Sequence, residues 1–302
     1  MAMTNETIAV ADNFYSIVEE VCKELYIKAL KDIPPDVREA LKKAREKEND
    51  PVAKEIFETI FKSIEISDKD SMLICQDTGI PIYWVEIGTK LIINGIALQE
   101  AITRGTQRAT LEHPLRSSVV SPLRRQNNQS STGYRVPIIH FEFIKDADYL
   151  NIKMVPKGSG SEQMSFLKML IPADGITGIK KYVLNCVVEA GANPCPSTIV
   201  GIGIGGTADY CAYLAKKAAT RRVGSSNPDP EIAALEKELL EYINESGIGP
   251  MGLGGNNTAL AVHIEQAYTH ITQNPVAVNM QCWAARRAAA RIYGDGRKEL
   301  GY

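Results

Sequence analysis

The chain has 302 residues and a formal net charge of -2 at pH 7, with 44% hydrophobic and 23% charged residues, the values of an ordinary globular protein. This near-neutral charge argues against nucleic acid and anionic membranes as main partners, because both attract basic surfaces. No basic N-terminal region precedes an apolar run, and no stretch of about 18 uninterrupted apolar residues occurs, so we expect no signal peptide, no transmembrane helix and a cytoplasmic location.

Three helices are predicted within residues 5–66. Apolar residues recur at helical spacing over residues 17–29 until Pro34-Pro35 breaks the pattern, and two further helices are predicted at 37–47 and 52–64. The charged faces of these helices are expected to be solvated surface rather than a binding face. We therefore expect a helical lobe over about residues 1–66.

Helices and strands alternate in the rest of the chain. Apolar runs and alternation predict strands at 82–87, 138–143, 149–155, 198–204, 259–264 and 276–280. Helical spacing predicts helices at 95–112, 175–190, 207–219 and 230–245. The expected fold class is α+β, with one domain over 1–302 in which the N-terminal helical region packs on a mixed α/β body of about residues 67–302.

The six cysteines fall into two groups by their sequence setting. One group lies inside helical apolar patterns and is expected to pack in the core: Cys22, Cys186 and Cys211. The other three end or interrupt an apolar segment at a turn, next to polar residues: Cys75, Cys195 and Cys282. Without paired C-x-x-C spacing, these three do not form a recognisable zinc motif.

Each of the three turn cysteines has a distinctive neighbourhood. Cys75 begins the run Cys75-Gln-Asp-Thr-Gly79, which places a thiol, an amide, a carboxylate and a hydroxyl on consecutive residues, although a loop with a free buried cysteine is the alternative. Cys195 lies between two prolines, which prevent its segment from joining a helix. Cys282 is predicted to begin a helix with Arg286 and Arg287 one turn on, a setting that lowers a thiol pKa.

Three thiolates with few histidines nearby suit a cubane iron-sulfur cluster in which one iron has no protein ligand. Such an iron is a Lewis acid that binds a hydroxyl and a carboxylate and helps the hydroxyl leave, which is chemistry for a hydro-lyase. The alternative is three unremarkable buried thiols.

Other polar segments point to an anionic ligand. Arg116 lies two residues after Pro114, at a boundary marked by proline, where a fixed guanidinium can grip a carboxylate with two hydrogen bonds, the alternative being a surface salt bridge. The polar loop 121–133 is expected either to be mobile or to wrap a ligand. The run Lys157-Gly-Ser-Gly-Ser-Glu162 presents backbone N–H groups for an anion, or is ordinary turn chemistry.

The glycines at 201–206 spell G-x-G-x-x-G between a predicted strand and helix, the pattern of a dinucleotide site. No second parallel strand is predicted directly after the helix. We therefore favour glycines that allow close backbone approach beside Cys195, and keep a nicotinamide-dependent oxidoreductase as an alternative.

The chain resembles the N-terminal part of the class I fumarases, which in subunit form is the alpha subunit of two-subunit fumarate hydratases and L-tartrate dehydratases. The resemblance runs over nearly the whole chain and rests on five motifs: Cys75-Gln-Asp-Thr-Gly79, Pro114-Leu-Arg116, Lys157-Gly-Ser-Gly-Ser-Glu162, Asn193-Pro-Cys195-Pro196 and Gln281-Cys282-Trp283-x-x-Arg286-Arg287. It implies the fold of that family's N-terminal domain. It also implies that Cys75, Cys195 and Cys282 hold a 4Fe-4S cluster.

The resemblance further implies which residues contact substrate. Gln76, Asp77, Arg116 and the backbone of the Gly158 to Gly160 loop would contact a dicarboxylate. Asp77 would assist the base that removes a C3 proton, the alternative being a loop-capping aspartate. His270 would lie near the cluster and share in catalysis.

The implied activity is reversible hydration of fumarate to L-malate, a step of the tricarboxylic acid cycle. Dehydration of L-tartrate or another hydroxy-diacid is the alternative, because the run 127–137 resembles the tartrate-dehydratase branch while the 157–162 loop is fumarase-like. The family's swivelling C-terminal domain is absent here, so we expect a beta subunit to carry it in a hetero-oligomer. A non-catalytic iron-sulfur sensor subunit is a further alternative.

Overall fold

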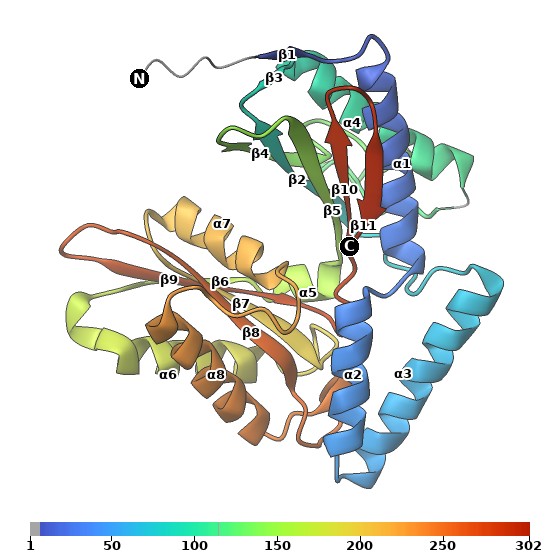
Figure 1. Ribbon diagram of the computed structural model, residues 1–302. Coiled ribbons are helices and arrows are strands. Elements are labelled where there is room, and N and C mark those ends of the chain that lie inside the picture. Colours follow the sequence, from blue (N-terminus) through green and yellow to red (C-terminus); the bar gives the residue numbers. More distant parts are fainter. Residues whose placement is uncertain (1–6, 114) are drawn as a thin grey trace. The chain divides into compact units, whose positions relative to one another are not determined.

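The computed structural model describes residues 7–113 and 115–302, so Pro114 of the second motif lies outside the described residues (Figure 1). The chain divides into two compact units. The first is built from the described parts of Met1–Pro34, Ser67–Lys157 and Arg286–Tyr302, and the second from Pro35–Ile66 and Gly158–Ala285. Each unit is described by itself.

The first unit is a five-stranded sheet with two helices, seen with α1 and α4 in Figure 1. The strand order is β11 (Lys298–Gly301), β10 (Ala288–Tyr293), β5 (Tyr149–Lys157), β2 (Ile80–Gly88) and β4 (Ile138–Ile144). Strand β2 is parallel to β4 and antiparallel to β5. A short parallel pair joins β1 (Ile8–Ala9) to β3 (Leu91–Ile92).

Helices α1 (Phe14–Lys31) and α4 (Gly95–Glu112) share one core with β2, β5 and β10. Alternate residues of β5, Leu150, Ile152 and Met154, are fully buried in this core. The apolar stripe of α1 meets them, because residues three and four apart lie on one helix face. The core thus fixes the sheet whose strand ends carry the candidate residues.

The second unit contains a four-stranded sheet in the order β6 (Phe166–Leu170), β9 (Asn274–Gln281), β7 (Thr198–Gly205) and β8 (Ala259–Ala267). In Figure 1, α7 (Ala208–Ala219) lies on one face, with α6 (Gly175–Ala190) and α8 (Pro230–Glu245) on the other. This unit also contains α2 (Pro35–Lys47), most of α3 (Pro51–Asp70), α5 (Ser159–Gln163) and two short 3-10 helices (Pro172–Asp174 and Pro250–Gly252).

The glycines of the G-x-G-x-x-G pattern allow α7 to lie directly on β7. A Cβ atom on Gly203 would be 2.1 Å from the Cys211 carbonyl oxygen, and one on Gly201 would be 2.2 Å from the Ala219 nitrogen. The expected close backbone approach is present, but its partner is α7 rather than the Cys195 loop. A parallel strand, β8, does follow, only after both α7 and α8.

The predicted helices and strands are present except for the helix expected to begin at Cys282, and the α+β fold class is confirmed. Sequence reasoning missed β6, β10 and β11, which are short or close to the C-terminus. The three N-terminal helices are divided between the two units, and a single domain over 1–302 stays a prediction. Among the described residues, no helix is both long and apolar enough to cross a membrane.

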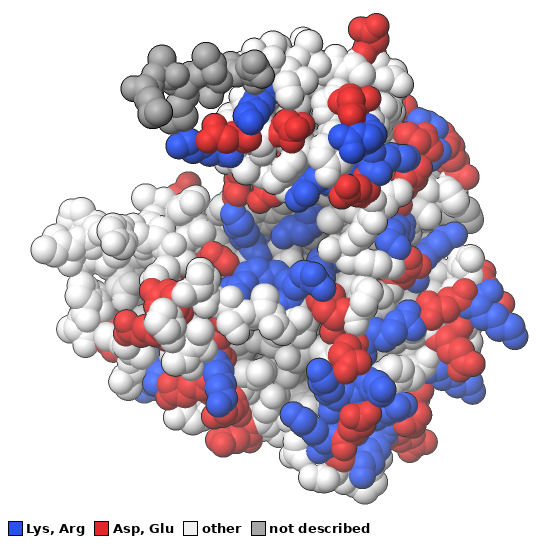
Figure 2. All heavy atoms as spheres, viewed as in Figure 1, with Lys and Arg blue, Asp and Glu red and all other residues white. Residues whose placement is uncertain are grey.

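The charged faces of α2 and α3 are surface, as expected. Figure 2 shows acidic and basic side chains interspersed over these helices. Pairs such as Lys43 with Glu39 and Arg45 with Glu58, each 3.4 Å apart, are local ion pairs with exposed partners. Such mixed pairs contribute little stability and offer no field of one sign to a ligand.

Candidate functional site

In the first unit, the turn that carries Cys75, Gln76 and Asp77 joins α3 to β2. Three hydrogen bonds hold its backbone: Ile74 N–H to the Leu30 carbonyl (3.0 Å), Arg286 Nη1 to the Asp77 carbonyl (2.7 Å) and Tyr26 Oη to the Thr78 carbonyl (3.2 Å). Cys75 and Gln76 are exposed, and Asp77 is half-buried. A rigid backbone therefore presents a thiol, an amide and a carboxylate.

Gly79 is required at the end of this turn. Its φ is +70°, and a Cβ atom would be 2.6 Å from the Pro156 carbonyl carbon and 2.8 Å from the Lys157 nitrogen. The Gly79 N–H donates to Asp77 Oδ1 at 2.8 Å. One carboxylate oxygen of Asp77 thus caps the turn, which is the alternative role considered for this residue.

Arg116 is anchored by its backbone, with its side chain exposed. Thr78 Oγ1 donates to the Arg116 carbonyl. No ion pair or hydrogen bond of the Arg116 side chain occurs among the described residues, so the surface salt bridge is not seen there. The guanidinium is available to an anion.

The polar loop 121–133 folds back on the residue that follows Arg116. Asn127 Nδ2 donates to the Ser117 carbonyl at 2.9 Å, and the Ser131 N–H donates to Ser117 Oγ at 3.0 Å. Ser131 is fully buried. The loop is therefore ordered and is hydrogen-bonded to the segment that contains Arg116.

The second unit brings Cys195 and Cys282 together. The register of β7 and β9 pairs Ile199 with Gln281, and the Trp283 N–H donates to the Cys195 carbonyl at 3.1 Å. Cys195 is exposed with a φ of +53°, uncommon for a residue with a side chain, and Cys282 is half-buried. Strained backbone of this kind clusters at functional sites.

The helix predicted to begin at Cys282 is absent. Residues 282–285 form a turn closed by the Ala285 N–H and the Cys282 carbonyl at 3.0 Å, and the chain continues as β10. The alanines and arginines favour a helix locally, but pairing of β10 with β5 and β11 outweighs this preference. The helix-terminus argument for a reactive Cys282 is therefore wrong.

The Gly158 to Gly160 loop lies beside the Cys195 segment within the same unit. A Cβ atom on Gly160 would be 2.8 Å from the Asn193 carbonyl oxygen. Ser159 and Gly160 belong to the first turn of α5, and Glu162 in the same helix forms an ion pair with Lys216 and accepts from Asn279 Nδ2 at 3.3 Å. Asn279 is in β9, so this loop is tied to the strand that leads to Cys282.

His270 is exposed in the connection between β8 and β9, where its Nδ1 is 2.9 Å from Thr272 Oγ1. Cys282 follows the other end of β9, whose 8 residues span about 26 Å. His270 and Cys282 therefore flank opposite ends of β9, and the position of His270 near a cluster stays a prediction.

The thiols divide as the sequence predicted. Cys22, Cys186 and Cys211 are buried, and burial raises the pKa of Cys186 and of Cys211 to about 11 each. The other three are accessible, and all six are free of disulfides. No group of three or more His, Cys, Asp or Glu side chains placed to hold a metal occurs among the described residues. Cys75 belongs to the first unit and the other two accessible thiols to the second.

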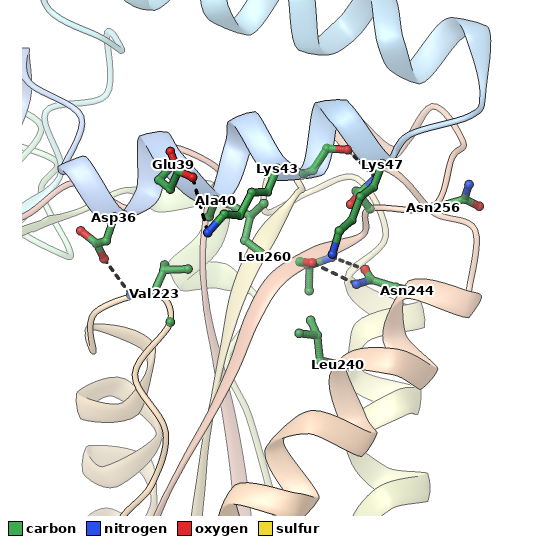
Figure 3. Close-up of a pocket in the computed structure, with 14 residues that line it drawn as sticks. Asp36, Glu39, Ala40, Lys43, Lys47, Val223, Leu240, Asn244, Asn256 and Leu260 are labelled. Atoms are coloured by element: carbon green, nitrogen blue, oxygen red, sulfur yellow. Dashed lines mark hydrogen bonds and ion pairs between the residues drawn. The ribbon is translucent and has the colours of Figure 1, made fainter.

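A pocket of about 600 Å³ in the second unit contains none of the predicted site residues (Figure 3). Several of its polar groups form hydrogen bonds with neighbouring residues. Asp36 Oδ2 accepts from the Val223 N–H at 2.7 Å, and the Asn244 side chain donates to the Ala259 carbonyl and accepts from the Ala259 N–H. Lys43 is paired with Glu39. This pocket is not the candidate site.

The chain belongs to the fumarate hydratase (Fumerase) family, whose sequence model matches residues 19–291.

Relatives with curated names carry the comparison further. A protein of Methanocaldococcus jannaschii, provisionally named L(+)-tartrate dehydratase subunit alpha, is 46% identical over 282 residues, covering 93% of this chain and 99% of the relative. The L(+)-tartrate dehydratase subunit alpha of Escherichia coli is 34% identical over 263 residues, covering 87% of this chain and 86% of its own.

Proposed function

We propose that this chain is the alpha subunit of an iron-sulfur hydro-lyase that dehydrates L(+)-tartrate. The observation that carries the substrate assignment is the 46% identity over 99% of the relative named as a tartrate dehydratase alpha subunit. This favours the alternative weighed from the sequence over fumarate hydration. Fumarate and L-malate remain the second candidate pair, because the family description names fumarate hydratase and the Lys157–Glu162 loop is of that kind.

The three accessible cysteines, Cys75, Cys195 and Cys282, are the ligands we assign to a 4Fe-4S cluster. Their fit rests on the donor chemistry: these thiols form no disulfide and are exposed or half-buried, two are neighbours in the second unit, and the remaining thiols are buried. A cluster with three protein ligands supplies a Lewis-acidic iron that helps a hydroxyl leave.

The chain's own residues bind and orient the diacid. Arg116 would grip one carboxylate with its unpaired guanidinium, and Gln76 and the backbone of Gly158 and Gly160 would bind the remaining oxygens. Asp77 would assist removal of the C3 proton with its carboxylate, which the Gly79 N–H holds in place. His270, which flanks the opposite end of β9 from Cys282, would share in catalysis as the resemblance implies.

The reaction balances without a redox partner. Loss of the C2 hydroxyl and the C3 proton from tartrate leaves an enol, which tautomerises to oxaloacetate with release of one water. A beta subunit carrying the swivelling domain would complete the site in a cytoplasmic hetero-oligomer. Its expected contribution is further basic groups for the second carboxylate.

Co-expression with the partner subunit, followed by reconstitution with iron and sulfide, tests the proposal. Oxaloacetate formation from L-tartrate should exceed turnover of L-malate or fumarate. Cys75→Ala, Cys195→Ala and Cys282→Ala should each lose the cluster absorbance, whereas Cys186→Ala, a buried thiol, should keep it. Turnover of malate with none of tartrate would reverse the substrate assignment.

Two other results would replace the enzyme assignment. A loaded cluster and bound partner without turnover of any hydroxy-diacid would favour a sensor subunit. A saturable change in NADH fluorescence on titration would favour an oxidoreductase.

A further inference from the structure

We infer that Thr78 is a positioning residue, which fixes the guanidinium of Arg116 relative to the carboxylate of Asp77 and so sets the length of diacid that the site accepts. The inference rests on the proposed function for its substrate. It concerns a side chain that does not itself touch substrate.

Thr78 is fully buried and immediately follows Asp77. Its Oγ1 donates to the Arg116 carbonyl and lies 3.1 Å from Ser118 Oγ. One hydroxyl therefore joins the two segments that carry the proposed carboxylate and guanidinium. A buried hydroxyl deprived of its partner is costly, and Thr78 is fully buried, so the segments should stay joined while the hydroxyl is present.

The Asp77 side of this link is rigid. The Thr78 carbonyl accepts from the hydroxyl of Tyr26, a fully buried residue of α1, and the Asp77 carbonyl accepts from Arg286, which is 4% exposed. Gly79 is packed against the backbone at Lys157. The turn is thus fixed to a helix and to the end of β5.

The Arg116 side is held less regularly, by packing of Leu115 against the core and by its own loop. Residues 115–120 belong to no helix or strand, and the bonds to Ser117 come from Asn127 and Ser131, in the same long loop. The Arg116 segment and the polar loop therefore form one hydrogen-bonded segment, residues 115–131, which we call the clasp. Thr78 ties this clasp to the rigid turn.

The consequence is a defined separation between the guanidinium that would bind one carboxylate of the diacid and the carboxylate that would assist removal of its C3 proton. A displacement of about 1 Å at a reacting centre costs about 100-fold in rate, so loss of the tie should be measurable. It should also relax discrimination between four-carbon and five-carbon hydroxy-diacids.

The test compares Thr78→Val, which keeps the shape and removes the hydroxyl, with Thr78→Ser, which keeps the hydroxyl. Thr106→Val is the matched control, because Thr106 is also fully buried in the first unit and its hydroxyl bonds Tyr83 and the Ile102 carbonyl in the α4 region. In the reconstituted complex, Thr78→Val should lower kcat/KM about 100-fold with a raised KM. Thr78→Ser should recover most of this loss, and Thr106→Val should stay within about twofold of wild type.

Two readouts separate positioning from a general loss of stability. Amide exchange of residues 115–131 in the metal-free chain should rise about tenfold in Thr78→Val and stay unchanged in Thr106→Val. In an Arg116→Lys background, Thr78→Val should cost less than about twofold further, because its effect acts through Arg116.

Unchanged exchange in Thr78→Val, or full additivity with Arg116→Lys, would overturn the inference. If the wild-type complex turns over no hydroxy-diacid, the proposed function fails. The exchange comparison then still decides whether Thr78 holds the clasp.

Discussion

Glu48 is a buried carboxylate that holds the loop next to the Cys195 segment, and its replacement by glutamine should destabilise the second unit. It is 1% exposed. Its Oε1 accepts from the backbone N–H groups of Asn49 (2.9 Å) and Asp50 (3.1 Å), and its Oε2 accepts from the Asn256 N–H (3.0 Å) and Asn257 Nδ2 (2.7 Å). The Asn257 carbonyl in turn accepts from Ser197 Oγ, two residues after Cys195.

Both oxygens of Glu48 face donors only, so Glu48→Gln must point its NH2 group at N–H groups in either orientation. Two mispaired donors correspond to about 3 kcal/mol of lost unfolding free energy. Burial by itself raises the pKa of Glu48, but the hydrogen bonds from Asn257 and from nearby backbone N–H groups outweigh it and lower the pKa below its usual value.

The lowered folded-state pKa fixes the sign of the pH dependence. The carboxylate stabilises the fold above its unfolded pKa of about 4.3, and this stabilisation disappears as the pH falls through the lower folded value. Urea unfolding followed by circular dichroism should show a gap of about 3 kcal/mol between wild type and Glu48→Gln near pH 7, narrowing towards about pH 3. Glu46→Gln, on the exposed part of α2, is the control. Equal stability of the two variants, or a gap independent of pH, would refute the reasoning.

Three further changes test the packing and the thiols. Gly203→Ala should lower the free energy of unfolding in urea by about 3 kcal/mol, because the new Cβ atom would lie 2.1 Å from the Cys211 carbonyl oxygen. Gly301→Ala, whose Cβ atom would have no neighbour within 4 Å, should lower it by less than about 0.5 kcal/mol. Arg221→Met should lower the free energy of unfolding by about 3 kcal/mol, because it leaves the 5% exposed Glu236 carboxylate without the guanidinium 2.8 Å away. Arg222→Met, at an exposed neighbouring residue, should be near neutral. Equal effects of the two variants would contradict the ion-pair argument. In metal-free protein at about pH 8, a thiol reagent should label the exposed Cys75 and Cys195 quickly. It should label the buried Cys186 and Cys211, each with a pKa of about 11, only when the protein unfolds. Mass spectrometry that found the buried thiols modified equally fast would contradict their burial.

Much of the local structure and of the candidate site could be read from the sequence. Helical spacing located α1, α2, α4, α6, α7 and α8, since one buried face leaves a periodic record in the residues themselves. The same periodicity separated the packed Cys22, Cys186 and Cys211 from the accessible thiols at turns. The run Cys75-Gln-Asp-Thr-Gly79 predicted a turn that requires glycine at its end, because few residues other than glycine adopt a positive φ.

Only the tertiary structure decided which distant segments meet. After Cys282 the local sequence favours a helix, but the chain forms strand β10. The backbone N–H and carbonyl groups of β10 pair with β11 and with the distant β5, and this pairing outweighs the local preference. The position of His270 depends on the direction of β9, which no local pattern records. Likewise, the bond from Thr78 to the Arg116 carbonyl joins residues 38 apart, so it exists only once α1, β2 and the clasp have folded around one core. Sequence periodicity encodes what each residue buries locally, whereas partners across the fold are fixed by packing and strand pairing.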